Sequence, residues 1–168
     1  MLIEILVPPA KGKKYNHKKG CRNVAKELQE NSLKDEFAVA IIDKNKNSID
    51  YLKVFLILDE VQNDLILYRH KNEAKHHYFI QICPAVEKWI FKVCDEEAIS
   101  LNDFGLPCDF DRFKLLTKSQ DSTHDKRFLE LFNRFRSSNN PKVKKLKGWI
   151  KLLKEKNYQV DIKELRNA

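Results

Sequence analysis

The sequence predicts an α/β fold with a mostly parallel central sheet, flanking helices and a helical C-terminal extension. Three apolar runs rich in β-forming residues support this prediction, at residues 2–7 (LIEILV), 37–43 (FAVAIID) and 78–82 (YFIQI). A turn and an amphipathic helical pattern follow each run, and strands that alternate with helices are typical of parallel sheets. We therefore expect an α/β core over residues 1–100 and a helical extension over residues 101–168 that packs on it.

Length and composition indicate one folded core. The chain has 168 residues, of which 42% are hydrophobic and ten are Phe, so disorder throughout is excluded. Its formal net charge of +8 favours anionic partners, because surplus lysine and arginine attract phosphate groups. A lysine-rich protein without such a partner would have the same composition. The position of the charges must therefore decide whether the protein binds an anionic partner.

The cysteines and the apolar runs predict a cytoplasmic protein. The four cysteines include no CxxC pair, which favours free thiols in a reducing compartment over disulfides or a zinc site. The start of the chain, MLIEILVPPAKGKK, carries its cations after the apolar run, whereas a signal peptide carries them before it. No apolar run approaches the length of a membrane-spanning helix, so we expect no membrane partner.

The first half of the chain predicts alternating strands and helices. Residues 2–7 are expected as a strand that the Pro8-Pro9 pair ends. A helix should follow to about residue 31, with one apolar face formed by Cys21, Val24, Ala25 and Leu28. After the strand at 37–43, Asn47-Ser48 should cap a helix, although the apolar run at 54–60 also fits a strand. Residues 64–70 and 77–82 predict two further strands.

The second half predicts helices. Pro84 should begin one whose buried stripe is Val86, Trp89, Ile90 and Val93. The DFD triplet at 109–111 resembles a metal-binding DxD, but Asp109 is better explained as a helix cap. A helix over about 122–137 should bury Phe128, Leu131, Phe132 and Phe135, and a last one should cover about 141–156.

Two lysine-rich stretches are candidate phosphate-binding surfaces. Residues 10–22 contain no acid and six cations, namely Lys11, Lys13, Lys14, Lys18, Lys19 and Arg22. The last helix carries further cations, of which the first four are Lys142, Lys144, Lys145 and Lys147. Both stretches also fit solvated surface, and a basic amphipathic helix could instead bind a protein partner. DNA or RNA is the partner that we expect.

Two carboxylates are candidate catalytic and metal-binding residues. Asp43 ends an apolar strand, and the carboxyl edge of a parallel sheet is where such folds bind ligands. Glu87 lies at the edge of the following helical stripe, where it could face that edge or be merely solvated. Together they could hold Mg²⁺ through oxygen ligands, and the metal could activate water. His76 and His77 should point to opposite faces of a strand and so cannot chelate one ion.

The order of these motifs resembles the Toprim-like proteins, including the Toprim part of OLD-type nucleases and small Toprim-related bacterial families. The resemblance covers about residues 1–100 and is carried by Asp43-Lys44-Asn45, in place of the family's DxD, and by Pro84, Glu87 and Trp89. It implies a Rossmann-like sheet and a Mg²⁺ site. However, Pro8 stands where the family has a glutamate, Asn45 replaces the second acid, and one strand-helix unit is missing. The resemblance therefore implies a degenerate member that does not cut.

Three functions are consistent with these patterns. The first is a catalytically degenerate nucleic-acid-associated protein, in bacterial defence or mobile-element biology. The second is an inert module that binds a protein partner through its basic C-terminal helix. The third is a Mg²⁺-dependent phosphohydrolase or nuclease that uses Asp43 and Glu87.

Overall fold

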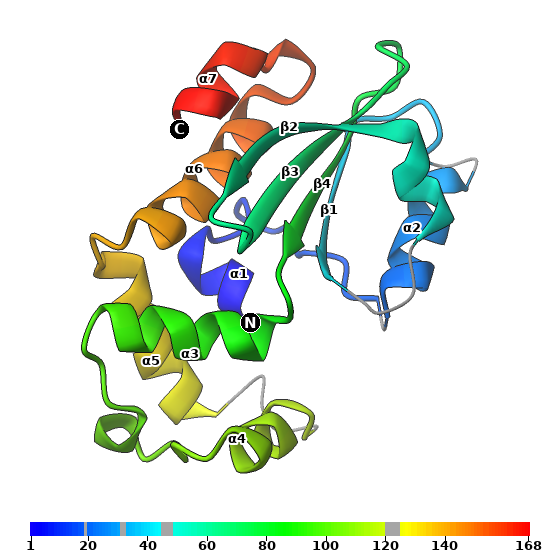
Figure 1. Ribbon diagram of the computed structural model, residues 1–168. Helices are drawn as coiled ribbons and strands as arrows, with labels where there is room; N and C mark the ends of the chain where they lie inside the picture. The colour runs from blue at the N-terminus through cyan, green and yellow to red at the C-terminus, as the bar shows by residue number, and fades with distance from the viewer. Residues whose placement is uncertain (19, 31–32, 45–48, 120–124) are drawn as a thin grey trace. The chain divides into compact units, whose positions relative to one another are not determined.

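The computed structural model describes residues 1–168 except 19, 31–32, 45–48 and 120–124 (Figure 1). The chain forms two compact units. Unit 1 comprises Met1–Tyr15 and Glu87–Lys147, and unit 2 comprises Asn16–Val86 and Gly148–Ala168. Whether residues 1–100 form a domain by themselves stays a prediction.

Unit 2 contains a four-stranded mixed sheet in the order β1-β4-β3-β2 (Figure 1). Its strands are β1 (Ala38–Asp43), β2 (Phe55–Val61), β3 (Leu65–His70) and β4 (His77–Ile82). Only β1 and β4 pair in parallel, while β4 with β3 and β3 with β2 are antiparallel. The prediction of a mostly parallel, Rossmann-like sheet is therefore wrong.

The antiparallel pairing follows from short connections. Gln62 and Asn63 turn the chain between β2 and β3 with φ values of 50° and 57°, and Asp64 N–H donates to Val61 O at 2.8 Å. Two consecutive residues with positive φ are typical of hairpin turns. The parallel direction expected for the strand at 37–43 is observed only in its pairing with β4. All six residues of β4 are buried, and this strand has β1 in parallel on one side and β3 antiparallel on the other, so an apolar run does not specify strand direction.

The predicted first strand is also wrong, because residues 2–6 form a short helix, α1 (Leu2–Leu6), in unit 1. Its two buried residues, Leu2 and Leu6, are four positions apart, which places them on one helical face. The N-terminal ammonium also pairs with Glu4 at 3.0 Å, three positions along the helix. A short apolar run does not distinguish strand from helix by periodicity, and here packing against α5 selects the helix.

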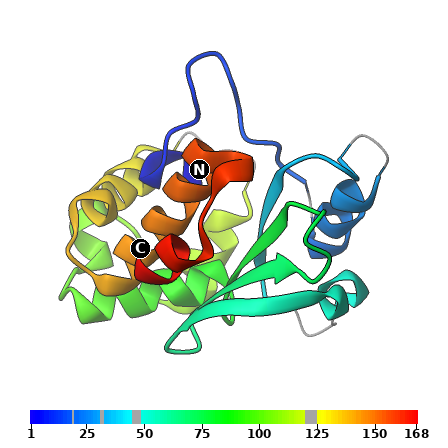
Figure 2. The same ribbon diagram turned by 90° about the horizontal axis from the view of Figure 1, so that it is seen from above.

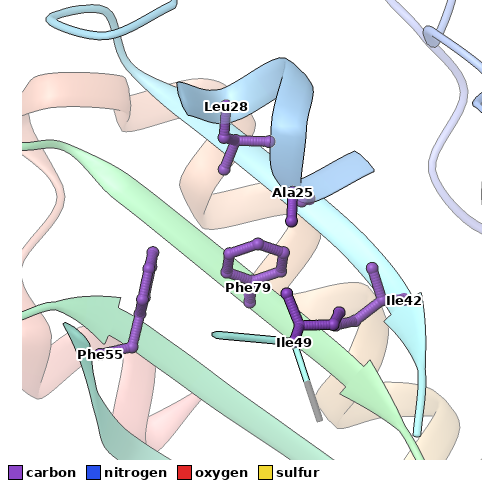
Figure 3. Packing of buried hydrophobic residues seen from close by; sticks show 7 residues of the cluster. Ala25, Leu28, Ile42, Ile49, Phe55 and Phe79 are labelled. Carbon is purple, nitrogen blue, oxygen red and sulfur yellow. The ribbon is translucent and has the colours of Figure 1, made fainter. Parts of the chain in front are cut away.

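Helix α2 (Cys21–Gln29) covers one face of the sheet and forms the core of unit 2 with it. Ala25 and Leu28 pack with Ile42, Phe55 and Phe79 in one buried cluster (Figure 3). This confirms the predicted helical face of α2. Phe79 is fully buried at the centre of the cluster, and burying a side chain of this size contributes about 2 kcal/mol.

The segment between β1 and β2 forms a 3-10 helix, η1 (Asp50–Val54), and residues 55–61 form a strand. The strand alternative for the apolar run at 54–60 is thus the one observed. The proposed cap at Asn47-Ser48 lies outside the described residues.

The C-terminal part of unit 2 comprises η4 (Asn157–Gln159) and α7 (Ile162–Asn167). Figure 2 shows α7 and α2 on opposite faces of the sheet. Arg166 Nε donates to Leu58 O of β2 at 3.1 Å, and the Tyr158 hydroxyl accepts from Phe37 N–H at 2.8 Å. These bonds fasten the chain end to both edges of the sheet.

The described elements of unit 1 are helical, and together with η4 and α7 of unit 2 they confirm that the C-terminal half of the chain is helical. The elements of unit 1 after α1 are α3 (Val86–Glu96), η2 (Leu101–Phe104), α4 (Phe110–Thr117), α5 (Lys126–Ser137) and the start of α6 (Pro141–Lys156). Asp109 caps α4 by accepting from Arg112 N–H at 2.9 Å, as predicted. Residues 122–124 of the predicted α5 lie outside the described residues.

A chain of aromatic rings forms the core of unit 1. Phe113 contacts Phe128, Phe128 contacts Phe132, and Phe135 contacts both Phe132 and Trp89, with ring centroids 5.4 to 6.2 Å apart. Two of these four pairs meet edge to face, which the ring quadrupoles favour, and the other two are tilted. The apolar stripes predicted for α3 and α5 are therefore the ones that meet.

Within the described residues, no helix has the length and apolar character needed to cross a membrane. All four cysteines are free, with Cys83 and Cys94 buried.

Candidate nucleic-acid interface

Asp43, the last residue of β1, holds the start of α3. Its carboxylate accepts from Val86 N–H at 3.1 Å, and its backbone carbonyl accepts from the Cys21 thiol at 3.4 Å. The side chain is half-buried. A carboxylate on the first N–H groups of a helix is stabilised by the helix dipole. The geometry therefore gives Asp43 a capping role in unit 2.

Glu87 belongs to unit 1, and its carboxylate is engaged there. It accepts a hydrogen bond from the Thr117 hydroxyl of α4 at 3.1 Å. Asp43 and Glu87 thus each have a polar partner within their own unit. In the part of the chain that the structure describes, no three His, Cys, Asp or Glu side chains lie close enough together to hold a metal ion. The catalytic and Mg²⁺-binding roles of Asp43 and Glu87 stay predictions.

The basic stretch at 10–22 is divided between the two units. Lys11, Lys13 and Lys14 lie in unit 1, are exposed, and have no acidic partner among the described residues. In unit 2, Lys18 pairs with Glu27 at 3.0 Å. Arg22 is exposed on α2, and Lys19 lies outside the described residues. Lys11, Lys13 and Lys14 therefore form the one group of neighbouring cations among the described residues of this stretch that has no acidic partner.

Lys142 is not a surface residue, although the sequence suggested one. Its side chain is 1% exposed, and its ammonium pairs with the Glu96 carboxylate at the end of α3. Asn140 donates to the same carboxylate at 3.0 Å and caps α6 by accepting from Lys142 N–H at 2.9 Å. Burial tends to raise the pKa of Glu96, but the hydrogen bonds from Lys142 and Asn140 outweigh it and hold the pKa below its ordinary value. Lys142 therefore joins two helices of unit 1.

The remaining lysines at the start of α6 differ in exposure. Lys144 is exposed, while Lys145 and Lys147 are half-buried. The Lys147 ammonium donates to Arg136 O at 2.6 Å, at the C-terminal end of α5, where a cation stabilises the helix dipole. This bond places Arg136, which is exposed, beside the α6 lysines. We call Arg136, Lys144 and Lys147 the α5–α6 basic patch.

Arg136 was absent from the residues that the sequence singled out. A signal for it existed: residues 126–147 contain a single acid, Glu130, against eight cations, namely Lys126, Arg127, Arg134, Arg136, Lys142, Lys144, Lys145 and Lys147. The α5 cations were overlooked because the apolar stripe of that helix dominated its pattern. Of these eight, Arg127 pairs with Asp125 and Lys142 with Glu96.

The two adjacent histidines lie in different surroundings, although only His77 belongs to β4. His76 meets the ring of Tyr158 with centroids 4.9 Å apart. His77 is fully buried: its Nε2 lies 2.8 Å from Leu33 O and its Nδ1 lies 2.8 Å from the Tyr51 hydroxyl. Since a carbonyl only accepts, Nε2 carries the proton and Tyr51 donates to Nδ1. His77 is therefore a neutral structural residue of unit 2.

Comparisons with protein-family models, with curated proteins and with solved structures found no significant match.

Proposed function

We propose that this protein binds DNA or RNA through the phosphate backbone, using the α5–α6 basic patch of unit 1. A catalytic step is not part of the proposal. The observation that carries it is the charge of residues 126–147, where eight cations accompany one acid. Such an excess of positive charge attracts polyanions, and binding is strengthened by the release of their bound counterions. The proposal keeps the cytoplasmic location expected from the sequence.

The two ion pairs in this segment sharpen the proposal. Lys142 and Arg127 already pair with carboxylates, which compensate their charges, so they should contribute little to binding an anionic ligand. Arg136 and Lys144 are exposed, and none of the described residues pairs with their side chains. A phosphate contact would therefore replace water at these two cations, without first breaking an ion pair. We assign them the largest share of the binding.

Fluorescence anisotropy with a labelled duplex and a labelled single strand, across a series of KCl concentrations, tests the proposal. The logarithm of the affinity should fall linearly with the logarithm of salt concentration. The double variant Arg136→Gln, Lys144→Gln should weaken binding and reduce the slope by about two, since each phosphate contact contributes about 0.9.

The matched control is Lys26→Gln, Lys34→Gln, which removes the same charge from exposed positions of unit 2. It should bind nearly as tightly as the unaltered protein. Equal losses in the two variants would show attraction by net charge alone and refute the α5–α6 assignment. An unaltered protein that binds neither oligonucleotide at low salt would refute the function and favour a protein partner for the basic helix.

A further inference from the structure

The chain between α1 and Tyr15 forms a loop that is closed at its base. The Tyr15 hydroxyl donates to Val7 O at 2.8 Å, so one hydrogen bond joins the two ends of residues 8–14. Figure 2 shows the backbone of this part of the chain as a dark-blue loop. Within the loop, Lys13 N–H donates to Ala10 O at 2.9 Å, and Gly12 has φ +77°, where a side chain would be strained. We call residues 8–14 the tethered loop.

The tethered loop carries three cations and no acid. Lys11, Lys13 and Lys14 are exposed, and none of them pairs with an acid among the described residues. Lys18, four residues further, shows the other arrangement, because Glu27 neutralises it. Three like charges within four positions repel one another, so the closed loop holds them together against that repulsion. An anion with several charges would relieve it.

We propose that the tethered loop is a preordered binding element for the phosphodiester backbone and that Tyr15 is its positioning residue. The inference rests on the proposed function and adds a second contact to it. A loop that is already closed loses less conformational freedom on binding than an open one, and this raises affinity. The Tyr15–Val7 bond therefore contributes to binding although Tyr15 itself touches no phosphate.

The chemistry of the loop favours nucleic acid over a membrane surface. Its residues other than the lysines are two prolines, one alanine and one glycine, so it has no large apolar side chain to insert between lipid chains. Peripheral membrane binding combines charge with such insertion. The tethered loop offers charge alone.

A double-mutant cycle in the full chain tests the role of Tyr15, with the anisotropy titration as the readout. One arm is Tyr15→Phe, which removes the hydroxyl and keeps every charge. The other arm is the triple variant Lys11→Gln, Lys13→Gln, Lys14→Gln. The triple variant should reduce the salt slope by close to three, and Tyr15→Phe should lower affinity about fivefold. In the Tyr15→Phe background, the triple substitution should cost less than in the unaltered protein.

Two controls accompany the cycle. The triple variant Lys26→Gln, Lys34→Gln, Lys118→Gln removes equal charge from exposed positions outside the loop and should bind more tightly than the loop variant. Circular dichroism of Tyr15→Phe checks that it is folded. If it is not, Tyr15→His, which keeps a ring with a hydrogen-bond donor, should recover both folding and affinity.

The outcomes separate the loop from the wider function. Additive effects of the two arms would overturn the role of Tyr15. Unchanged binding by the loop variant, with reduced binding by Arg136→Gln, Lys144→Gln, would remove the loop and leave the proposed function intact. Failure of the unaltered protein to bind oligonucleotides would overturn both. Tighter binding to phosphatidylserine vesicles than to the duplex would overturn the assignment to nucleic acid.

Discussion

Two lysines near the start of helix α6 show how differently the same residue type can be used. Lys142 is 1% exposed and pairs with Glu96, whereas Lys144 is exposed and has no partner among the described side chains. Positions two residues apart on a helix point in nearly opposite directions. One lysine therefore joins helices of unit 1, and the other is available to a ligand. The number of lysines in the sequence therefore overestimates the positive charge that is accessible to a binding partner.

Unit 2 contains a similar contrast between His76 and His77. His77 is enclosed by Tyr51 and the Leu33 carbonyl, while His76 lies against Tyr158. His77 is the first residue of β4 and His76 precedes the strand, so these neighbours have different partners, as the two lysines do. Buried polar groups such as Lys142 and His77 should therefore affect folding, and exposed ones such as Lys144 should affect binding.

The largest effect is expected from Glu96→Ala. This substitution leaves the Lys142 ammonium buried without its carboxylate, which should lower the free energy of unfolding by about 3 kcal/mol. Urea denaturation measures it. Lys142→Met should cost much less, because it removes the buried charge and keeps most of the side-chain volume. Equal costs for the two variants would contradict the ion-pair explanation.

The second effect is a loss of stability in mild acid. Burial lowers the pKa values of His70 and His77 below their ordinary value of 6.5, so the folded state resists protons that the unfolded chain accepts. Their contribution is complete above about pH 6.5 and is lost as pH falls through the folded-state values. The slope should reach about 1.4 kcal/mol per pH unit for each histidine. Urea denaturation from pH 7.5 downwards measures it.

The variant His77→Gln sharpens the pH prediction, because it removes one titrating group and should flatten the slope. The depressed pKa of Glu96 acts in a separate, more acidic window. Its contribution is present above the ordinary value of 4.5 and is lost below it. An unchanged slope in His77→Gln would show that His77 is not the titrating group.

A smaller effect is expected from Tyr51→Phe. The substitution removes the hydroxyl that donates to His77 Nδ1 and leaves that buried acceptor unsatisfied, at a cost of about 1.5 kcal/mol. Thermal unfolding followed by circular dichroism measures the change. Tyr158→Phe makes a useful comparison, since that hydroxyl is bonded at an exposed position. A greater loss for Tyr158→Phe would contradict the importance given to burial.

The smallest effect on stability is expected from Arg136→Gln, Lys144→Gln. Exposed positions without ion pairs usually change the free energy of unfolding by less than about 0.5 kcal/mol. The same variant should show the loss of oligonucleotide binding described above. A large loss of stability would show that Arg136 and Lys144 have a structural role like that of Lys142. It would contradict the distinction between buried and exposed cations.

Much of the helical structure could be predicted because its signals are local. The spacing of Trp89, Ile90 and Val93 and that of Phe128, Leu131 and Phe135 each marked one buried helical face, and both faces are in the core. Asp109 was recognisable as a cap because its acceptor role involves a residue only three positions away. These signals require no knowledge of the rest of the chain.

The prediction failed where the answer depended on distant residues. The direction of a strand follows from its neighbours, and β1 lies beside β4 although almost forty residues separate them. The run at residues 2–7 predicts a strand, but residues 2–6 form a helix, because six residues are too few to show a helical or a strand period. The same holds for the candidate site. Its basic character was evident from composition, but composition did not show that Lys142 is buried or that Arg136 belongs to the α5–α6 basic patch.

The amino-acid sequence alone determined the amphipathic helices, the excess of positive charge and the polar caps, because each depends on residues within one or two helical turns. The tertiary structure decided the antiparallel sheet, the burial of Lys142 against Glu96 and the closure of the lysine loop by Tyr15. These features depend on which distant groups meet. That choice is made by packing and by the cost of burying unpaired polar groups, which act on the whole chain at once.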